Sequence, residues 1–215
     1  QGCGIIITDA GNKYTPQACQ TYLKKYGCHS AQALILPSME RQSVLTAAQL
    51  LSEGLPDRIY FHEEGEIPDE IEKRLYPECV LLQGQGRMEL EVTPGGEGEA
   101  SEKAKILIEA VPSEGGLWYN IQIGTHTVLI ATGENDARFL PLELRSPELL
   151  LVRDAVKHLE ELQPGLLVLS SSEKSMSRCL PELVYGAPYL YTTAENGTLS
   201  FGTDGEGEWE VQREA

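Results

Sequence analysis

The strongest hydrophobic pattern in the chain lies between residues 33 and 52, where an apolar run is followed by a polar loop and then by helical spacing. Ala33–Leu36 is apolar at every position, which is typical of a strand buried on both faces. The apolar residues of Val44–Leu51 recur at helical spacing and share one face of a helix. The loop between them, Pro37–Ser43, follows the end of a buried strand, where α/β folds usually place their chemistry. We therefore expect this stretch to position any functional site.

The neighbouring segments extend the alternation of strand and helix. Ile5–Thr8 and Arg58–His62 have the composition of strands, and a helix is predicted from Thr15 and Pro16 to Gly27. Gly54 is expected to cap the helix that follows the loop. The resulting β-α-β-α-β order favours a parallel sheet covered by helices.

The second half of the chain is richer in strands. A short helix is expected at Pro68–Leu75, a longer helix at Asp154–Leu162 and a helical turn at Cys179–Tyr185. Thr93–Lys103 is predicted to be a loop whose glycines lack the strand and helix setting of a phosphate-binding loop. Apolar runs and alternation predict strands at Val80–Leu82, Met88–Val92, Lys105–Val111, Leu117–Ile123, His126–Thr132, Leu149–Val152, Leu166–Leu169, Tyr189–Tyr191, Leu199–Phe201 and Trp209–Val211.

These elements form two halves, each with strands and helices, and no linker separates them. A chain of 215 residues can bury about 70% of its unfolded surface as one domain. We therefore predict a single α/β domain over residues 1–215, an αββα sandwich with mixed sheets covered by helices.

The net charge is the most informative total. It is −16, from 33 acidic and 17 basic residues. Non-specific affinity for nucleic acid comes mainly from Lys and Arg displacing counterions, so tight binding to naked DNA is not expected. The acidity is expected to keep the domain soluble. Direct DNA binding without catalysis would show itself by a steep loss of affinity with salt.

The five cysteines predict neither a zinc site nor a disulfide framework. They have no C-x-x-C spacing, so free and mostly buried thiols are expected at Cys3, Cys19, Cys28, Cys79 and Cys179. No run in the given sequence approaches the ~18 apolar residues of a membrane-spanning helix, and its first residues lack the basic and apolar pattern of a leader, so the chain as given is expected to be soluble.

Four further motifs occur in the order of a known family. They are Gly4–Asn12, which resembles L-I-D-x-G, Val128–Glu134, which resembles L-L-T-G-D, Leu162–Ser170, which resembles L-x-P-x-x-x-V-I-S, and Tyr191–Leu199, which resembles Y-R-T-D-x-x-G-T-I. With the strand, loop and helix at 33–52, the chain resembles the metallo-β-lactamase superfamily, in the form found at the soluble end of ComEC-type competence (DNA-uptake) proteins. The resemblance implies that the chain is a fragment of a larger membrane protein, and Gln1-Gly2 matches part of the family's V-G-Q-G.

The loop at Pro37–Ser43 departs from the family at every metal ligand. The family carries T-H-x-H-x-D-H here, whose histidines and aspartate hold one or two zinc or manganese ions. The matching positions of this chain are Ser38 and Glu40 for the first two histidines, Gln42 for the aspartate and Ser43 for the third histidine. Only Glu40 could bind a metal.

The second half of the family's site is also changed. The strand Leu149–Val152 is followed in the family by an H-H-G-S loop, whereas here Arg153-Asp154-Ala155 leads directly into the predicted helix. Glu134 replaces the bridging aspartate of T-G-D. The four histidines of the chain form no H-x-H pair, and surface or hydrogen-bonded roles are expected for His29, His62, His126 and His158.

Catalysis and bound metal are therefore not expected. Asp9, Glu40 and Glu134 are the weak candidates for a hard-cation site, and no catalytic or cofactor-binding residue is assigned. The sequence favours a catalytically inactive metallo-β-lactamase-like domain that acts as a structural or interaction module, without excluding an enzyme. The alternative is a metal-dependent hydrolase of the phosphodiesterase or nuclease type with a remodelled carboxylate site.

The resemblance also implies a setting and partners. We expect a soluble domain of a bacterial membrane protein, or alternatively a cytoplasmic protein. The implied partners are the membrane channel part of the same protein or other uptake proteins.

Overall fold

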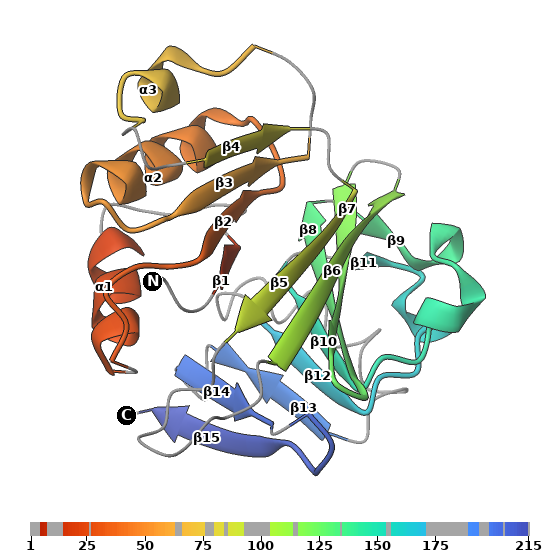
Figure 1. Cartoon of the computed structure of the whole chain (residues 1–215). Helices are drawn as coiled ribbons and strands as arrows, with labels where there is room; N and C mark the ends of the chain where they lie inside the picture. Colours follow the sequence, from red (N-terminus) through yellow and green to blue (C-terminus); the bar gives the residue numbers. More distant parts are fainter. Residues whose placement is uncertain are drawn as a thin grey trace. The chain divides into compact units, whose positions relative to one another are not determined.

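The computed structural model divides the chain into two compact units, drawn in Figure 1. One unit comprises Gln1–Gly86 and Glu91–Lys103, and the other comprises Arg87–Leu90 and Ala104–Ala215. The structure describes residues 5–7, 15–25, 27–62, 66–75, 80–83, 86–92, 104–113, 116–133, 135–153, 156–170, 189–193, 198–203 and 205–214. Each unit is considered by itself.

The first unit contains a parallel sheet. Within the described residues it has four strands in sequence order: β1 (Ile5–Ile7), β2 (Ala33–Leu36), β3 (Arg58–Phe61) and β4 (Val80–Gln83). In the register, Ile35 lies between Ile7 and Tyr60. Every residue of β2 is buried, as its uninterrupted apolar sequence predicts.

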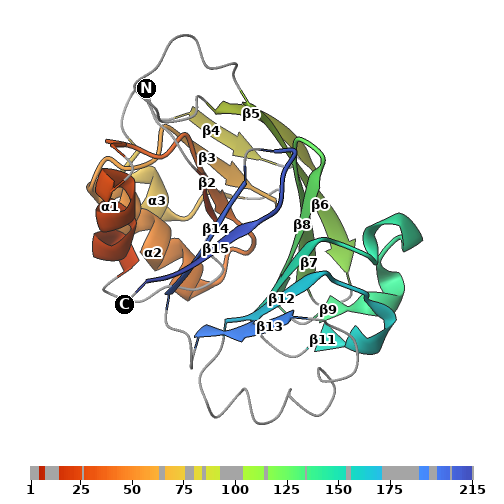
Figure 2. The ribbon, with the colours of Figure 1, turned by 90° about the horizontal axis from the view of Figure 1, so that it is seen from below.

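The helices of this unit lie on one side of the sheet, as Figures 1 and 2 show. They are α1 (Thr15–Lys25), α2 (Arg41–Ser52) and α3 (Asp69–Glu72). Their apolar faces share one core with alternate residues of β2 and β3. The fully buried or nearly buried members of this core are Leu34, Leu36, Val44, Ala47, Leu50, Leu51, Leu55, Ile59, Phe61 and Ile71. The predicted β-α-β-α-β order and the short third helix are confirmed.

Helix α2 begins earlier than the sequence predicts. Arg41, Gln42 and Ser43 form its first turn, so the loop after β2 is limited to 37–40. Ser43 is fully buried, and Val44 donates a backbone hydrogen bond to the carbonyl of Glu40 at 3.0 Å. The sequence pattern did not indicate this helix start, because Arg41, Gln42 and Ser43 are polar and the helix was predicted from the spacing of its apolar residues. At the other end Gly54 has a φ of +66°, the left-handed conformation expected after a helix.

The second unit is built on a mixed sheet. Within the described residues it has seven strands, in the order β13-β12-β10-β8-β7-β6-β5. The pairings β6–β7 and β7–β8 are antiparallel, whereas β10 is parallel to both β8 and β12, and β12 is parallel to β13. The strands are β5 (Arg87–Val92), β6 (Ala104–Ser113), β7 (Gly116–Ile123), β8 (His126–Gly133), β10 (Leu149–Val152), β12 (Leu166–Leu169) and β13 (Tyr189–Thr192).

Among the described residues, short elements cover one face of this sheet (Figure 1). They are the paired strands β9 (Asn135–Asp136) and β11 (Val156–Lys157), and the 3₁₀ turns η1 (Ala137–Phe139), η2 (Leu142–Leu144) and η3 (Leu159–Glu161). The buried core beneath them consists of Trp118, Leu129, Ala131, Ala137, Leu140, Leu150, Val152, Val156, Leu159, Leu162, Leu167 and Leu169. A separate hairpin, β14 (Thr198–Gly202) with β15 (Glu210–Glu214), completes the unit.

The helix predicted at Asp154–Leu162 is wrong. Val156–Lys157 is a strand, His158 has a left-handed backbone with a φ of 56°, and a 3₁₀ turn follows at Leu159–Glu161. Apolar residues three positions apart suit a 3₁₀ turn as well as an α-helix, so the spacing of Val156, Leu159 and Leu162 did not distinguish the two. In the structure, Val156 and Lys157 pair with β9 as a strand, which excludes an α-helix at these residues.

One expectation about the cysteines is also wrong. Cys28 is disulfide-bonded, whereas Cys19 is a free, partly buried thiol whose pKa is raised by burial. Sequence spacing does not reveal which cysteines meet in space, so a disulfide outside any local motif was missed. Cys3, Cys79 and Cys179 lie outside the described residues, as do the predicted loop at Thr93–Lys103 and the turn at Cys179–Tyr185. No helix in the described part of the chain is long and apolar enough to cross a membrane.

Candidate functional site

The segment after β2, where the family places its first metal ligands, holds no cluster of ligands in this chain. Met39 packs against the apolar core of the first unit, and Gln42 is exposed on the first turn of α2. Glu40 is exposed at the N-cap position of α2, and its side chain makes no capping hydrogen bond. Its carboxylate therefore faces water.

Of the three weak candidate ligands, Glu40 alone lies among the described residues. Glu40 is exposed at the N-cap position of α2, whereas Asp9 and Glu134 lie outside the residues that the structure describes. Among the described residues, no group of three or more His, Cys, Asp or Glu side chains could hold a metal ion.

Two buried polar atoms lie just beyond the carboxyl ends of β2 and β3, at one edge of the parallel sheet. Ser38 follows β2 and His62 follows the neighbouring strand β3, and both strands run in the same direction. Within the described part of the chain, Ser38 Oγ and His62 Nδ1 are buried atoms without a hydrogen-bond partner. Buried polar atoms are usually paired, so this edge keeps a polar character even though the histidine motif is missing.

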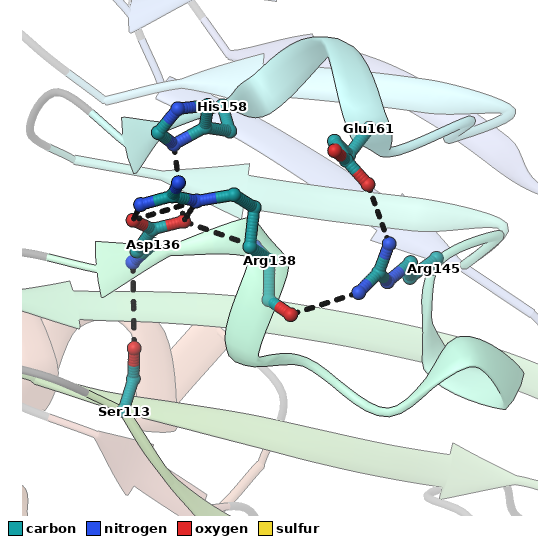
Figure 3. Close-up of polar contacts among 6 residues, drawn as sticks. All are labelled: Ser113, Asp136, Arg138, Arg145, His158 and Glu161. Atoms are coloured by element: carbon teal, nitrogen blue, oxygen red, sulfur yellow. Dashed lines mark hydrogen bonds and ion pairs between the residues drawn. The ribbon is translucent and has the colours of Figure 1, made fainter.

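A second polar group, the Asp136 cluster, lies in the second unit (Figure 3). It consists of Ser113, Asp136, Arg138 and His158. The Asp136 carboxylate accepts from Arg138 Nη2 at 2.7 Å, from Arg138 Nε at 3.1 Å and from the backbone N–H of Arg138 at 3.0 Å. Its other contacts are His158 Nδ1, 3.1 Å from Oδ1, and Ser113 Oγ, which accepts from the Asp136 backbone N–H at 3.3 Å.

This arrangement keeps Asp136 ionised. Its side chain is only 4% exposed, and charged groups are rarely buried without a partner. The hydrogen bonds from the Arg138 side chain hold the pKa of the Asp136 carboxyl well below its usual range, against the opposing effect of burial. The negative charge is thus stabilised by the Arg138 guanidinium.

The Asp136 cluster also fixes the chain where the predicted helix is missing. His158 Nδ1 lies on Asp136 Oδ1, and His158 carries the left-handed backbone that begins the turn η3. Next to it, Arg145 donates to the carbonyl oxygens of Leu140 at 3.0 Å and of Arg138 at 2.9 Å, and to Glu161 Oε2 at 2.5 Å. Figure 3 shows the links from Arg145, which follows η2, to Arg138 of η1 and Glu161 of η3. The cluster is therefore suited to holding this outer layer in place.

Sequence reasoning missed the Asp136 cluster. The one local signal is Asp136 itself, which caps η1 by accepting from Arg138 two residues later, a pattern typical of short turns that begin with Asp. The pairing of Asp136 with His158, 22 residues away, has no sequence signature. His158 and His126 do have the hydrogen-bonded roles expected for histidines, the latter with Glu148.

The structure resembles a solved metallo-β-lactamase fold. The crystal structure of the metallo-beta-lactamase fold protein YhfI from Bacillus subtilis superposes with a TM-score of 0.57 and 14% sequence identity, covering 87% of this chain and 84% of that chain. No family model and no curated protein matches the sequence. The chain therefore has the mixed α/β metallo-β-lactamase fold, and the part of it that the structure describes is rich in sheet and has few helices.

The residues present do not fit the metal ions that this fold commonly holds. Zinc sites use thiolate, imidazole and carboxylate ligands, and manganese prefers carboxylates and imidazole. Ser38, Gln42 and Ser43 offer neutral hydroxyl and amide groups at the aligned positions, and Ser43 is buried in the first turn of α2. The donor set at the described part of this loop is thus too poor for either metal.

Proposed function

We propose that the chain is a catalytically inactive metallo-β-lactamase-like domain that acts as a structural or interaction module. In this proposal residues 1–215 form a single domain with the αββα arrangement of its fold. The fold is retained, and the chemistry usually associated with it is lost.

The observation that carries the proposal is the segment 37–43. Its last three residues belong to the first turn of α2, its one carboxylate faces solvent, and Met39 packs into the core. A binuclear hydrolase needs several imidazoles and carboxylates that converge on the metals and leave a position open for water. Because residues 37–43 form the start of α2 and pack into the core, they support a structural role for the domain.

The proposed setting rests on the competence-like motifs. We place the domain in a bacterial DNA-uptake membrane protein, with the channel part of that protein or other uptake proteins as partners. A cytoplasmic location is the alternative. The net charge of −16 argues against naked DNA as the ligand, since phosphate contacts need clustered Lys and Arg.

A hydrolysis assay tests the loss of catalysis. The whole chain is incubated with a chromogenic phosphodiester and with linear DNA, each with zinc, manganese or magnesium, beside an authentic metallohydrolase as positive control. We expect no turnover above buffer with any metal. Metal-dependent turnover that disappears in Glu134→Ala and persists in Glu53→Gln, an exposed surface control, would overturn the proposal.

The alternative function is a metal-dependent hydrolase of the phosphodiesterase or nuclease type with a remodelled site. It is favoured by the unpaired buried atoms Ser38 Oγ and His62 Nδ1 at the carboxyl edge of the parallel sheet. In the same assay it predicts manganese-dependent cleavage that is lost in His62→Ala and retained in His29→Ala, since His29 is exposed. If His62→Ala kept full activity, any observed turnover would not depend on His62 at this edge of the sheet.

A further inference from the structure

The Asp136 cluster pairs a buried carboxylate with an imidazole that reaches the surface. His158 Nδ1 lies 3.1 Å from Asp136 Oδ1, and the two side chains are 38% and 4% exposed. The pairing of β11 with β9 sets Lys157 opposite Asp136, and His158 follows directly. On its other side, the His158 carbonyl accepts from the backbone N–H of Glu161 at 3.0 Å. The main chain that carries the ring is therefore held on both sides of His158.

The ionised carboxylate decides which nitrogen of His158 carries the proton. A carboxylate without its proton only accepts hydrogen bonds, so Nδ1 donates its hydrogen to Asp136. In the neutral ring the lone pair is then on Nε2, because one nitrogen donates and the other accepts. Nε2 lies on the side of the ring away from Asp136 and has no hydrogen-bond partner among the described residues (Figure 3). The pair therefore presents an oriented lone pair at the surface.

The same pair also prepares the ring for a positive charge. When Nε2 forms a bond with an electrophile, the ring becomes an imidazolium, and a carboxylate on Nδ1 stabilises this charge. Enzymes that use a histidine in catalysis orient its ring with a third group in the same way. A structural link alone requires neither an exposed ring nor an open second nitrogen. The geometry thus favours a nucleophile at His158 Nε2.

The Arg138 guanidinium indicates which electrophile suits this nitrogen. Arg138 Nε also lies 3.1 Å from Asp136 Oδ1, so the guanidinium and the imidazole contact the same oxygen atom. The Arg138 side chain is 52% exposed. Guanidinium groups bind phosphoryl oxygens well, because their planar set of N–H donors matches the geometry of a phosphate. The cluster therefore supplies, beside the lone pair, the type of cation that binds phosphoryl groups.

We propose that His158 is a phosphoryl-acceptor site for small activated donors of the phosphoramidate and acyl phosphate class, with Asp136 as its positioning residue. The Nε2 lone pair attacks phosphorus and forms the N–P bond, while the bond from phosphorus to the leaving group breaks and its electron pair departs with that group. His158 keeps its Nδ1 proton, and the positive charge on the ring is paired with Asp136. The inference goes beyond the proposed function and is independent of it, because the reaction uses no residue of the segment 37–43.

Incubation of the whole chain with phosphoramidate tests the site. Peptide mass spectrometry at neutral pH follows each histidine, because phosphohistidine is lost in acid. His29 is an internal control, since it is more exposed than His158 and has no hydrogen-bond partner among the described residues. We expect phosphorylation at His158 to be about tenfold faster or more than at His29, as for a hydrogen bond to a charged group. Exposure alone predicts the opposite order.

Two variants separate the orientation of the ring from its accessibility. Asp136→Asn removes the negative charge and keeps the shape of the side chain, so we expect about tenfold slower phosphorylation at His158 and an unchanged rate at His29. His158→Asn, which suits the left-handed backbone of this position, should lose the signal at 158 and keep the signal at His29. Circular dichroism at the temperature of the assay establishes that each variant is folded.

Either of two results would overturn the proposal. The first is phosphorylation of wild-type His158 at or below the rate of His29, a comparison that needs no variant and does not depend on the folding of Asp136→Asn. The second is an unchanged rate at His158 in folded Asp136→Asn, which would make His158 an ordinary surface histidine.

Discussion

A buried carboxylate must be compensated by its surroundings, and Asp136 shows how this chain does it. Active members of the fold place carboxylates against metal ions, whereas Asp136 is surrounded by the Arg138 guanidinium, a backbone N–H and the imidazole of His158. Every donor belongs to the protein itself. At the residue scale, the buried charge of Asp136 is therefore compensated by protein groups.

The Asp136 carboxylate makes stability depend on pH in a defined direction. Its pKa is lowered in the folded state by Arg138, so its contribution is complete above the unfolded value of about 3.9 and is lost as pH falls through the folded value. We expect Asp136→Asn to melt at a lower temperature than the wild type at pH 7, and the gap to narrow below about pH 4. Thermal melts of both proteins from pH 7 to acid measure the gap, with Glu143→Gln as control. A gap that is constant with pH would contradict this account.

The elements of the two units differ in how well the sequence predicted them. Uniformly apolar runs such as Ala33–Leu36 and Leu149–Val152 became buried strands, because a strand covered on both faces needs no alternation. Where the apolar period was three, at Val156, Leu159 and Leu162, a 3₁₀ turn and an α-helix fit equally well, and the long-range pairing of β11 with β9 chose the turn. Contacts between residues far apart in the sequence, such as His158 with Asp136 and the disulfide of Cys28, could not be predicted either, because no local sequence pattern indicates them.

The core beneath the short elements should carry much of the second unit's stability. Leu150 of β10 is fully buried between the neighbouring strands and the turns of the outer layer. We expect Leu150→Ala to lower the free energy of unfolding by about 2–5 kcal/mol, because it leaves a cavity that the surrounding strands cannot fill. Leu151→Ala on the same strand, at a partly buried position, should cost less. Chemical denaturation of the three proteins checks this, and equal losses would mean that the face toward η1 and η3 is not the main core.

At the scale of the whole molecule, the chain has the metallo-β-lactamase fold. A similar fold at 14% identity shows that the architecture tolerates nearly complete replacement of its sequence. Apolar cores on both sheets and the Asp136 cluster stabilise the described part of the chain. The net charge of −16 directs the search for partners toward basic or neutral protein surfaces rather than nucleic acid.

Bound metal is the most direct test of the proposed loss of catalysis. The protein is purified without chelator, exposed to excess zinc or manganese, passed through a desalting column and measured by elemental mass spectrometry. We predict metal contents far below one ion per chain for both metals, and no difference between the wild type and Glu40→Gln or Glu134→Gln. Near-stoichiometric zinc or manganese that is lost in either variant would show that a metal site survives, and would contradict the account of an inactive domain.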